Sequence, residues 1–527
     1  MIAAPTVAEI IHGLSQPEAY TERPSAVEVV QTHLSALFFV GPHVYKVKKP
    51  VNFGFVDYST LEKRRFYCEQ EVVLNRRLCP DLYLGVVGIT AGPGGLVVEG
   101  AGTPVEYAVK MVRMPHDRML DILLDRSQVT PEMTDRVARR LSEFHAQAET
   151  RPAISAYGEP KAVAANTEEN FTQCEPYIGR SITRRQWERI RSYSYKFLSD
   201  HQDLLWERVA GGRIRDCHGD VHSQHVCFAN GLYIYDCIEF NERFRYCDVA
   251  AEIAFLAMDL DYHDRPDLAS RLIATYGDLS GDAGLGQVMR YYQCYRAYVR
   301  GKVESFRLDD PQVPQEQREE AQRRAQRYFR LAYAYTATPG QPALYLVVGL
   351  PGTGKSTLAQ ALAGPLDAEV FNSDVVRKEL AGIAATEHRY SEFGEGIYRP
   401  ELTHRTYEGL AERARGQLGL ARSVVLDATF RGKEDRARAL AVAEELGVDA
   451  WVIECVLDEE TTRERMRRRE SEVSVSDALA RDLPRFQASF EPFDDIPSFQ
   501  HIRVNTAEAP GALVEQVLAE LPYFFHR

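Results

Sequence analysis

The sequence predicts two domains: an N-terminal α+β fold with two lobes, residues 1–337, and a C-terminal α/β fold with a parallel sheet, residues 338–527. The length of 527 residues exceeds the size at which one hydrophobic core keeps growing. The stretch at residues 337–342 holds two prolines and a glycine and leads directly into an apolar strand pattern. Exposed linkers of this composition commonly join domains, which is why we place the boundary after residue 337.

In the N-terminal part, strand patterns come first and helical patterns follow, which is typical of an α+β fold. Short apolar runs predict strands at residues 37–40, 44–47, 83–89, 96–99 and 107–111, with a helix at 61–78. A long helical stretch at 130–195 precedes two more strands, at 226–228 and 232–236. Helical patterns fill the remainder, up to a polar helix at 313–336.

In the C-terminal part, strands alternate with helices. The strand patterns lie at residues 343–348, 369–372, 423–426 and 449–456. This alternation predicts a doubly wound parallel sheet.

Composition excludes some classes of protein. The apolar share of 45% and the net charge of −13 fit an ordinary globular protein and argue weakly against a nucleic-acid partner, although a local basic groove stays open. The first twenty residues lack the basic start and apolar core of a secretory signal, and the apolar runs are too short to cross a bilayer. Nine cysteines without a CxxC pair favour buried free thiols. We expect a cytoplasmic protein without a membrane partner, and the sequence predicts no oligomeric state.

The clearest motif is GLPGTGKST at residues 349–357, which fits GxxxxGK[ST] between a strand and a helix. Glycines let successive N–H groups point at one anion, and the following helix adds its positive end. We expect Lys355 to reach the β- and γ-phosphates of ATP and act in transfer, and Ser356 to bind Mg²⁺. The alternative is a glycine-rich turn without a ligand. The predicted nucleotide contacts here are Gly349, Gly352, Thr353, Gly354, Lys355, Ser356 and Thr357.

Two acids follow later strands of this part. Asp374 lies where the second strand meets a helix, and strand ends on one edge of such a sheet line the ligand crevice. At that position the Asp374 carboxylate can accept a proton from the hydroxyl group of an acceptor. Arg377, one helical turn later, can hold an anionic group of the same acceptor. The alternative is that Asp374 only caps the helix. Asp427 follows the third strand and is a candidate Mg²⁺ ligand.

A run of arginines follows the fourth strand. Residues 458–470 read DEETTRERMRRRE, which predicts either a solvated, salt-bridged helix or a helical lid that brings cations to the transferring phosphoryl group.

Together, the phosphate loop, Ser373-Asp374-xx-Arg377 and Asp427-Ala428-Thr429 resemble the P-loop kinases that include polynucleotide 5′-kinases, zeta-toxin-like kinases, chloramphenicol phosphotransferase and gluconate kinase. The resemblance covers roughly residues 343–527. It implies that Asp374 is the general base, that Arg377 contacts the acceptor and that an arginine among residues 463–469 serves in the lid.

The N-terminal part carries a second constellation. Asp220 lies in the run CHGDVH, Asp236 closes the strand sixteen residues later, and a pair of carboxylates suits base and metal roles in phosphoryl transfer. Lys46 and Glu71 would seat the α- and β-phosphates, and the connection at residues 110–115, with Met114, would offer backbone groups to adenine. The alternatives are a solvated lysine, a surface glutamate and a turn acid.

In this order the motifs resemble aminoglycoside-phosphotransferase-like kinases, which share the protein-kinase fold, over roughly residues 36–260. The resemblance implies that Asp220 is the catalytic base and Asp236 the Mg²⁺ ligand. Two features depart from the family: His225 replaces the Asn of HGDxHxxN, and no GxGxxG loop precedes Lys46. Because Mg²⁺ prefers oxygen ligands, His225 indicates a weakened kinase, one with altered metal demand, or a substrate-binding scaffold.

The sequence therefore predicts an ATP- and Mg²⁺-dependent phosphotransferase acting on a hydroxyl group of a small molecule or nucleotide, with the C-terminal domain as the surer catalyst. Two alternatives remain: a polynucleotide or RNA 5′-hydroxyl kinase, and a non-catalytic ATP-gated regulatory module.

Overall fold

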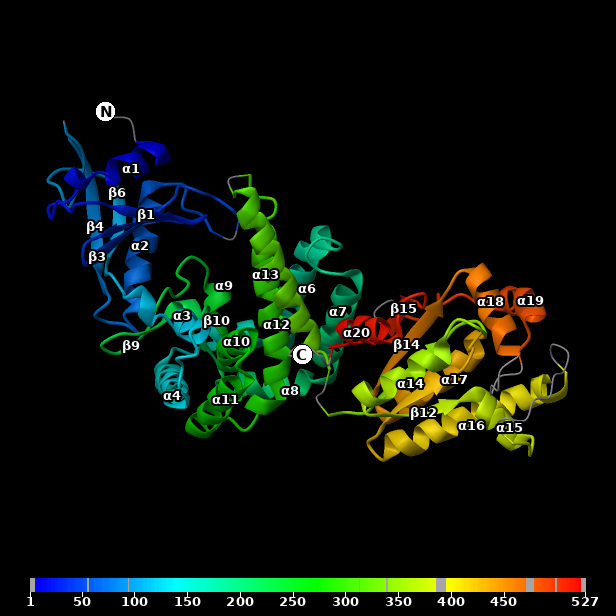
Figure 1. Ribbon diagram of the computed structural model, residues 1–527. Coiled ribbons are helices and arrows are strands. Elements are labelled where there is room, and N and C mark those ends of the chain that lie inside the picture. Colours follow the sequence, from blue (N-terminus) through cyan, green and yellow to red (C-terminus); the bar gives the residue numbers. More distant parts are fainter. Residues whose placement is uncertain are drawn as a thin grey trace. The chain divides into compact units, whose positions relative to one another are not determined.

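The computed structural model describes residues 5–54, 56–92, 94–311, 313–337, 340–384, 395–470, 478–497 and 500–522. The chain forms two compact units (Figure 1). Unit 1 comprises Met1–Pro176 and Ser194–Tyr328, and unit 2 comprises Tyr177–Tyr193 and Phe329–Arg527. The boundary that the sequence predicts after residue 337 stays a prediction.

Unit 1 opens with a six-stranded antiparallel sheet in the order β1-β2-β3-β6-β4-β5. Helix α2 (Leu61–Asn75) begins at Thr60, whose hydroxyl caps the first turn, and packs against β4 and β6. Its packing buries Cys68 and Val72 against the sheet. The strands are β1 (Glu28–Gln31), β2 (Ser35–Val40), β3 (His43–Lys48), β4 (Tyr83–Gly92), β5 (Gly95–Val98) and β6 (Pro104–Val112).

The rest of unit 1 is mainly helical. Helix α10 (Val249–Tyr262) is buried along nearly its whole length and forms the centre of the core with α4, α11 and α12. Two short antiparallel strand pairs precede α10 in the chain. They are β7 (Ile214–Asp216) with β10 (Tyr246–Asp248), and β8 (Val226–Phe228) with β9 (Leu232–Ile234). The main helices are α3 (Leu120–Asp125), α4 (Pro131–Gln147), α6 (Pro160–Cys174), α8 (Gln202–Ala210), α11 (Pro266–Ser280) and α12 (Leu285–Phe306). Helices α7 (Arg184–Asp200) and α13 (Gln315–Ala334) contain two of the three unit boundaries.

Unit 2 is a five-stranded parallel sheet in the order β12-β13-β11-β14-β15, which confirms the predicted α/β fold. Its centre, β11, is apolar and buried at every position, as expected for a strand covered on both faces. The strands are β11 (Ala343–Val348), β12 (Ala368–Asn372), β13 (Ser423–Asp427), β14 (Asp449–Val456) and β15 (His501–Asn505). The sequence analysis did not predict β15.

Helices cover this sheet. Side chains of α16 (Pro400–Gly419) and α17 (Lys433–Leu446) pack on Leu344, Leu346 and Val348 of β11. Helix α14 (Lys355–Leu366) packs on β12 and β13 and against α20 (Pro510–Glu520). Among the described residues, no helix combines the length and the apolar character needed to cross a bilayer.

Candidate active site

The carboxyl ends of the unit 2 strands converge on one cleft of about 810 Å³. Asp427 is the last residue of β13, Asn372 ends β12, and Thr506 follows β15; all three line the cleft. Parallel strands end at the same edge of a sheet, so residues far apart in the sequence meet there. The phosphate loop, which follows β11, forms one wall.

The glycines of the phosphate loop are required by its shape. Gly349, Gly352 and Gly354 have φ values of 143°, 83° and 84°, a region that side chains disfavour. A Cβ atom at Gly349 would lie 2.5 Å from the Cys455 carbonyl oxygen, and one at Gly352 would lie 2.9 Å from that of Thr462. Gly354 is also the N-cap of α14, so the loop delivers the helix N-terminus to the cleft.

Lys355, in the first turn of α14, is buried against the loop. Its Nζ donates to the Leu350 carbonyl oxygen at 2.8 Å, and burial lowers its pKa. A residue outside the loop also stabilises it, because the Thr506 hydroxyl donates a hydrogen bond to the Thr353 carbonyl oxygen at 2.6 Å. Lys355, Ser356 and Thr357 all line the cleft. Thus this short loop offers a cation, hydroxyl groups and a helix N-terminus to a bound anion.

Asp427 is a buried carboxylate at the floor of the cleft. The Asn372 side-chain amide donates to its Oδ2 at 2.6 Å. Burial raises the pKa of Asp427, while Lys355 and a hydrogen bond from Ser356 act in the opposite direction. A carboxylate beside a serine hydroxyl is a set of oxygen donors, which suits Mg²⁺.

Asp374 and Arg377 lie on one turn of α15 (Ser373–Leu380). The capping interpretation of Asp374 is wrong, because Asn372 is the N-cap: its side-chain oxygen accepts the N–H groups of Asp374 and Val375 at 2.9 and 3.2 Å. The Asp374 carboxylate lines the cleft, with the Tyr398 hydroxyl 3.5 Å and Arg377 Nε 4.0 Å from Oδ1.

Arg377 is held rigidly. Its Nη1 donates to the Ile397 carbonyl oxygen at 3.2 Å and to the Thr403 hydroxyl at 3.0 Å, and the guanidinium lies over the Tyr398 ring. The side chain is buried, and among the described residues its Nε has no hydrogen-bond partner. A cation fixed beside Asp374 in this way is ready to meet an anionic group in the cleft.

The arginine-rich segment is helix α18 (Glu459–Glu470), and it divides into two sets. Arg465, Arg468 and Arg469 line the cleft. Arg463 instead pairs with Glu459 at 2.6 Å, one turn back. One face of the helix thus lies on the cleft and another forms a surface ion pair, while the lid role stays a prediction.

The N-terminal constellation also comes together, within unit 1. Lys46 Nζ lies 2.8 Å from Glu71 Oε1 and 2.7 Å from Asp236 Oδ1. Lys48, two residues along β3, bonds Glu71 at 2.6 Å and also pairs with Glu239. The expectations of a solvated lysine and a surface glutamate are wrong, because the Glu71 side chain is fully buried and that of Lys46 nearly so. Burial opposes ionisation of Asp236, but Lys46 and His225 hold its pKa well below its usual range.

Asp220 lies in the loop that precedes β8, and His225 is the last residue of that loop. The His225 ring spans two carboxylates, with Nδ1 3.4 Å from Asp220 Oδ2 and Nε2 3.5 Å from Asp236 Oδ2. Met114, predicted as an adenine contact, follows β6 and packs half-buried against the hydrophobic cluster that includes Val109 and Met111. The residues predicted for unit 1 therefore lie around the β8–β9 hairpin and the β3–α2 contact.

Three contributors to the unit 2 site escaped the sequence analysis. Asn372 caps α15 and holds Asp427, Tyr398 approaches Asp374, and Thr506 ties the phosphate loop. Asn372 had a local signal, since Asn before a helix is a favoured N-cap. Thr506 had none, because its contact depends on the position of β15 in the sheet.

Three kinds of comparison show what the chain is similar to. A family model described as AAA domain matches residues 344–493. The uncharacterized protein Rv2004c of Mycobacterium tuberculosis (strain ATCC 25618 / H37Rv) is 31% identical over 432 residues, which is 82% of this chain and 84% of that protein. Shikimate kinase of Corynebacterium efficiens is 37% identical over 67 residues, 13% of this chain and 39% of the enzyme. A gluconokinase from Sinorhizobium meliloti aligns with 35% of this chain and 93% of its own at 17% identity and a TM-score of 0.26.

The parallel sheet, the GxxxxGK[ST] loop and the cleft at the strand ends define unit 2 as a P-loop α/β domain. The whole chain belongs to the same family as the uncharacterized mycobacterial protein Rv2004c.

Proposed function

We propose that the protein is an ATP-dependent phosphotransferase that moves the γ-phosphoryl group to a hydroxyl group in the unit 2 cleft. The observation that carries this proposal is that Lys355, Asp374, Asp427 and the α18 arginines line one cavity although they come from four separate segments. A phosphate loop alone supports binding of nucleotide. A loop that faces a carboxylate and the arginines of a helix has the parts needed for transfer.

In the proposed reaction, the phosphate loop binds the triphosphate and Lys355 turns from the Leu350 carbonyl oxygen to the β- and γ-phosphates. Asp374 accepts the proton of the acceptor hydroxyl, the acceptor oxygen bonds to the γ-phosphorus, and the bond from that phosphorus to ADP breaks. Mg²⁺, when bound, would neutralise phosphate charge, and Ser356 and Asp427 are the residues that would hold it.

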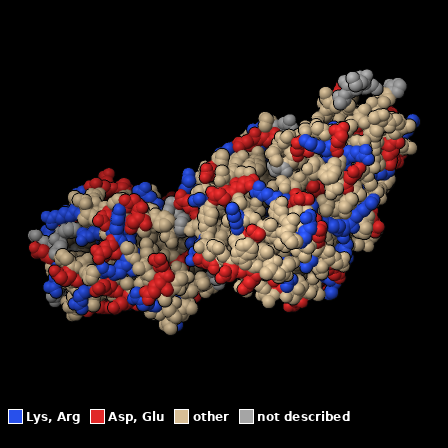
Figure 2. Space-filling model, turned by 180° about the vertical axis from the view of Figure 1, so that it is seen from behind, with Lys and Arg blue, Asp and Glu red and all other residues tan. Residues whose placement is uncertain are grey.

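The acceptor side of the cleft favours a small anionic alcohol. Arg377 and Arg431 line it together with Tyr398 and Tyr407, which gives cations and ring faces within one wall. A polynucleotide acceptor would also need a basic track leading to Asp374. Over the face seen in Figure 2, lysine and arginine side chains lie interspersed with acidic ones. The cations and ring faces that line the cleft support the small-molecule or nucleotide acceptor over a nucleic-acid end.

A screen with γ-labelled ATP tests the proposal. Wild type is incubated with sugars, hydroxyl-bearing metabolites, nucleotides and 5′-hydroxyl oligonucleotides, with Lys355→Ala and Lys433→Ala in parallel. Lys433 lies on α17 in a surface ion pair with Asp494, outside the cleft lining, and serves as the matched control. We expect label transfer by wild type and Lys433→Ala only. If ATP binds but no acceptor is labelled, the ATP-gated regulatory module is the better description.

A second nucleotide site in unit 1 is favoured by one observation, the buried Lys46–Glu71 pair at 2.8 Å beside Asp236. A lysine fixed by a glutamate can seat the α- and β-phosphates, with Asp220 as the base. We infer that unit 1 is a kinase-like module with Met114 near the adenine. Its donors do not fit Mg²⁺ well, since two histidines face Asp220, and we assign no metal-dependent step to it.

A further inference from the structure

Four side chains around the β8–β9 hairpin point at one another. His222 Nε2 lies 3.6 Å and His225 Nδ1 3.4 Å from Asp220 Oδ2, and His225 Nε2 lies 3.5 Å from Asp236 Oδ2. Asp220, His222 and His225 offer ligand atoms that all lie within 4.8 Å of one another. His222 is buried, and its Nδ1 has no hydrogen-bond partner among the described residues.

The hydrogen bonding of His225 fixes its tautomer. Nδ1 lies 2.9 Å from the Asp220 carbonyl oxygen, which only accepts, so Nδ1 carries the proton and donates it. When His225 is neutral, its Nε2 lone pair faces the Asp236 carboxylate, and a metal cation between these two donors would bind both. Metal-binding histidines commonly have this arrangement, in which one ring nitrogen donates to a backbone carbonyl and the other binds the ion.

The separations suit a transition ion. With bonds of about 2.0–2.1 Å, neighbouring ligand atoms of a tetrahedral zinc site lie about 3.3 Å apart. The distances between free donors in this cluster are 3.6 Å, from His222 Nε2 to Asp220 Oδ2, and 3.5 Å, from His225 Nε2 to Asp236 Oδ2. Two imidazoles with two carboxylates favour Zn²⁺ or a related first-row ion, whereas Mg²⁺ demands oxygen ligands.

The charges also leave room for a dication. Lys46 and Lys48 are matched by the buried acids Glu71 and Glu239. Asp220 and Asp236 remain, and Arg300 interacts electrostatically with both Asp259 and Asp220. The Asp220 and Asp236 side chains are 30% and 39% exposed, so an ion can reach them from solvent.

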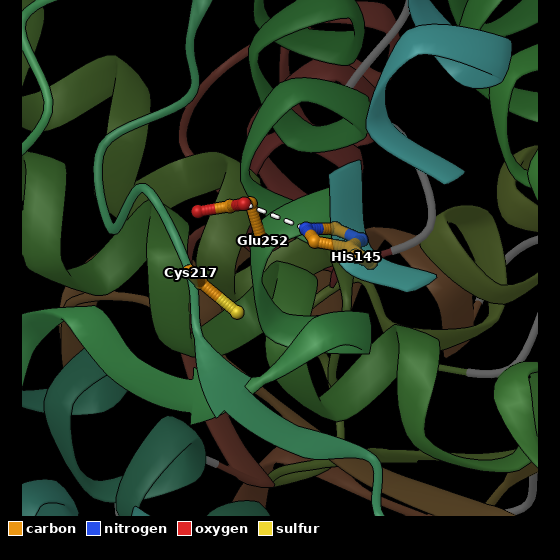
Figure 3. A group of neighbouring side chains, drawn as sticks. All are labelled: His145, Cys217 and Glu252. Carbon is orange, nitrogen blue, oxygen red and sulfur yellow. Dashed lines mark hydrogen bonds and ion pairs between the residues drawn. The ribbon is translucent and has the colours of Figure 1, made fainter. Parts of the chain in front are cut away.

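A neighbouring group of three residues, His145, Cys217 and Glu252, has a structural role rather than forming a second metal site (Figure 3). Glu252 accepts the backbone N–H groups of His218 and Gly219 at 2.9 and 2.6 Å and bonds the His145 ring at 2.7 Å. The Cys217 thiol donates to the Cys247 carbonyl oxygen. Each ligand atom already has a partner within the protein, and the group holds the loop that carries Asp220.

We propose that unit 1 binds one divalent transition ion of the Zn²⁺ class through Asp220, His222, His225 and Asp236. This inference goes beyond the proposed transfer reaction and does not depend on it, since it concerns binding of the metal alone. The ion would occupy the position at which the resemblance implies Mg²⁺, with His225 as the residue that changes the metal preference.

Titration of the full chain with Co²⁺ in the absence of nucleotide tests the proposal, because Co²⁺ reports its ligands by visible absorption. We expect one equivalent with d–d bands and no thiolate charge-transfer band, displaced by Zn²⁺ but not by excess Mg²⁺. His225→Asn should weaken Co²⁺ binding at least ~10-fold. His33→Asn is the matched control, a histidine of unit 1 that faces Asp310 at 3.0 Å, and should bind as wild type does.

Absence of Co²⁺ binding, or equal affinity in wild type and His225→Asn, would overturn the proposal and leave His225 as an imidazolium paired with the two aspartates. A thiolate band would assign the ion to a site with a cysteine ligand and overturn the proposal equally. Circular dichroism checks that His225→Asn folds, and Asp236→Asn replaces it if it does not, with the same expected loss. Because ATP is absent, these outcomes are independent of catalysis in unit 2.

Discussion

Asp374 shows how a single neighbour decides between two roles for a carboxylate. Its place before a helix suits a cap, but the Asn372 side chain satisfies the first N–H groups of α15 instead. Asp374 is thereby left to face the cleft, with Tyr398 and Arg377 near its Oδ1. The capping amide and the candidate base have separate functions, and substitution can test them separately.

Asp374→Asn keeps the shape of the side chain but cannot take a proton. We expect ATP affinity to stay as in wild type and turnover to fall about 10²–10⁴-fold, the usual contribution of a general base. Calorimetry and the labelled-phosphate assay measure the two quantities. Glu379→Gln, on the same helix in a surface pair with Arg413, is the matched control. Full turnover in Asp374→Asn would remove this residue from the mechanism.

The glycines of the phosphate loop differ in what surrounds them. A Cβ atom at Gly352 would approach Met466 at 2.6 Å and the Thr462 carbonyl oxygen at 2.9 Å, while at Gly354 it would meet only Arg465 at 3.5 Å and Thr506 at 3.6 Å or beyond. Both residues have positive φ, which costs another residue about 1 kcal/mol. Gly352→Ala should therefore lower thermal stability and ATP affinity more than Gly354→Ala, and equal effects would contradict the loop geometry.

At the scale of elements, α18 presents one face to the cleft. Arg465, Arg468 and Arg469 line the cavity, whereas Arg463 is occupied by Glu459. A helix that carries cations to the γ-phosphate acts in the transition state rather than in binding of ATP.

Arg468→Ala should therefore lower kcat by about 10²–10³-fold, the range for loss of one stabilising donor, with a smaller change in ATP affinity. Arg463→Ala, on the same helix, is the control and should keep wild-type rates. Steady-state kinetics with the acceptor found in the screen gives both values. A larger loss in Arg463→Ala than in Arg468→Ala would show that α18 approaches the phosphates by its other face.

Helix α10 stabilises the loop that carries Asp220 through Glu252. Burial opposes ionisation of this carboxylate, but hydrogen bonding to His145 and the backbone lowers its pKa from 4.5 to about 2. A depressed pKa stabilises the folded state above pH 4.5, and the contribution is lost as the pH falls toward 2. For this buried group the contribution is about 3 kcal/mol.

Glu252→Gln removes that titration. We expect the variant to be less stable than wild type near neutral pH and the difference to shrink as the pH falls from 5 toward 2. Unfolding in urea at several pH values measures it, with the exposed Glu143→Gln as the control. A difference that stays constant with pH would show that the ionised carboxylate is not what holds the loop.

At the scale of the whole molecule, features that depend on local sequence patterns were predicted better than features that depend on long-range contacts. β11, β14 and β8 begin and end at the predicted residues, and the phosphate loop lies where its motif requires. The burial of Lys46 and Glu71 was not predictable, because it depends on packing between β3 and α2. β15 and its neighbour Thr506 were missed for the same reason, since the strand matters only through its place at the sheet edge.

The sequence also could not predict which arginines of residues 463–469 face the cleft. The sequence does not distinguish the five arginines of this segment from one another. Only the orientation of α18 places Arg465, Arg468 and Arg469 on the cleft and Arg463 away from it. The roles of the predicted site residues stay predictions that the substitutions above test.

The measurement that tests the central claim most directly is a calorimetric titration of the full chain with Mg-ATP, comparing wild type, Lys355→Ala and Lys433→Ala. If unit 2 binds ATP through residues 349–357, Lys355→Ala loses about 1.5–3 kcal/mol at that site, roughly 10–100-fold in affinity, while Lys433→Ala matches wild type. Any binding in unit 1 would persist in all three proteins. Identical heats and affinities in wild type and Lys355→Ala would contradict the account.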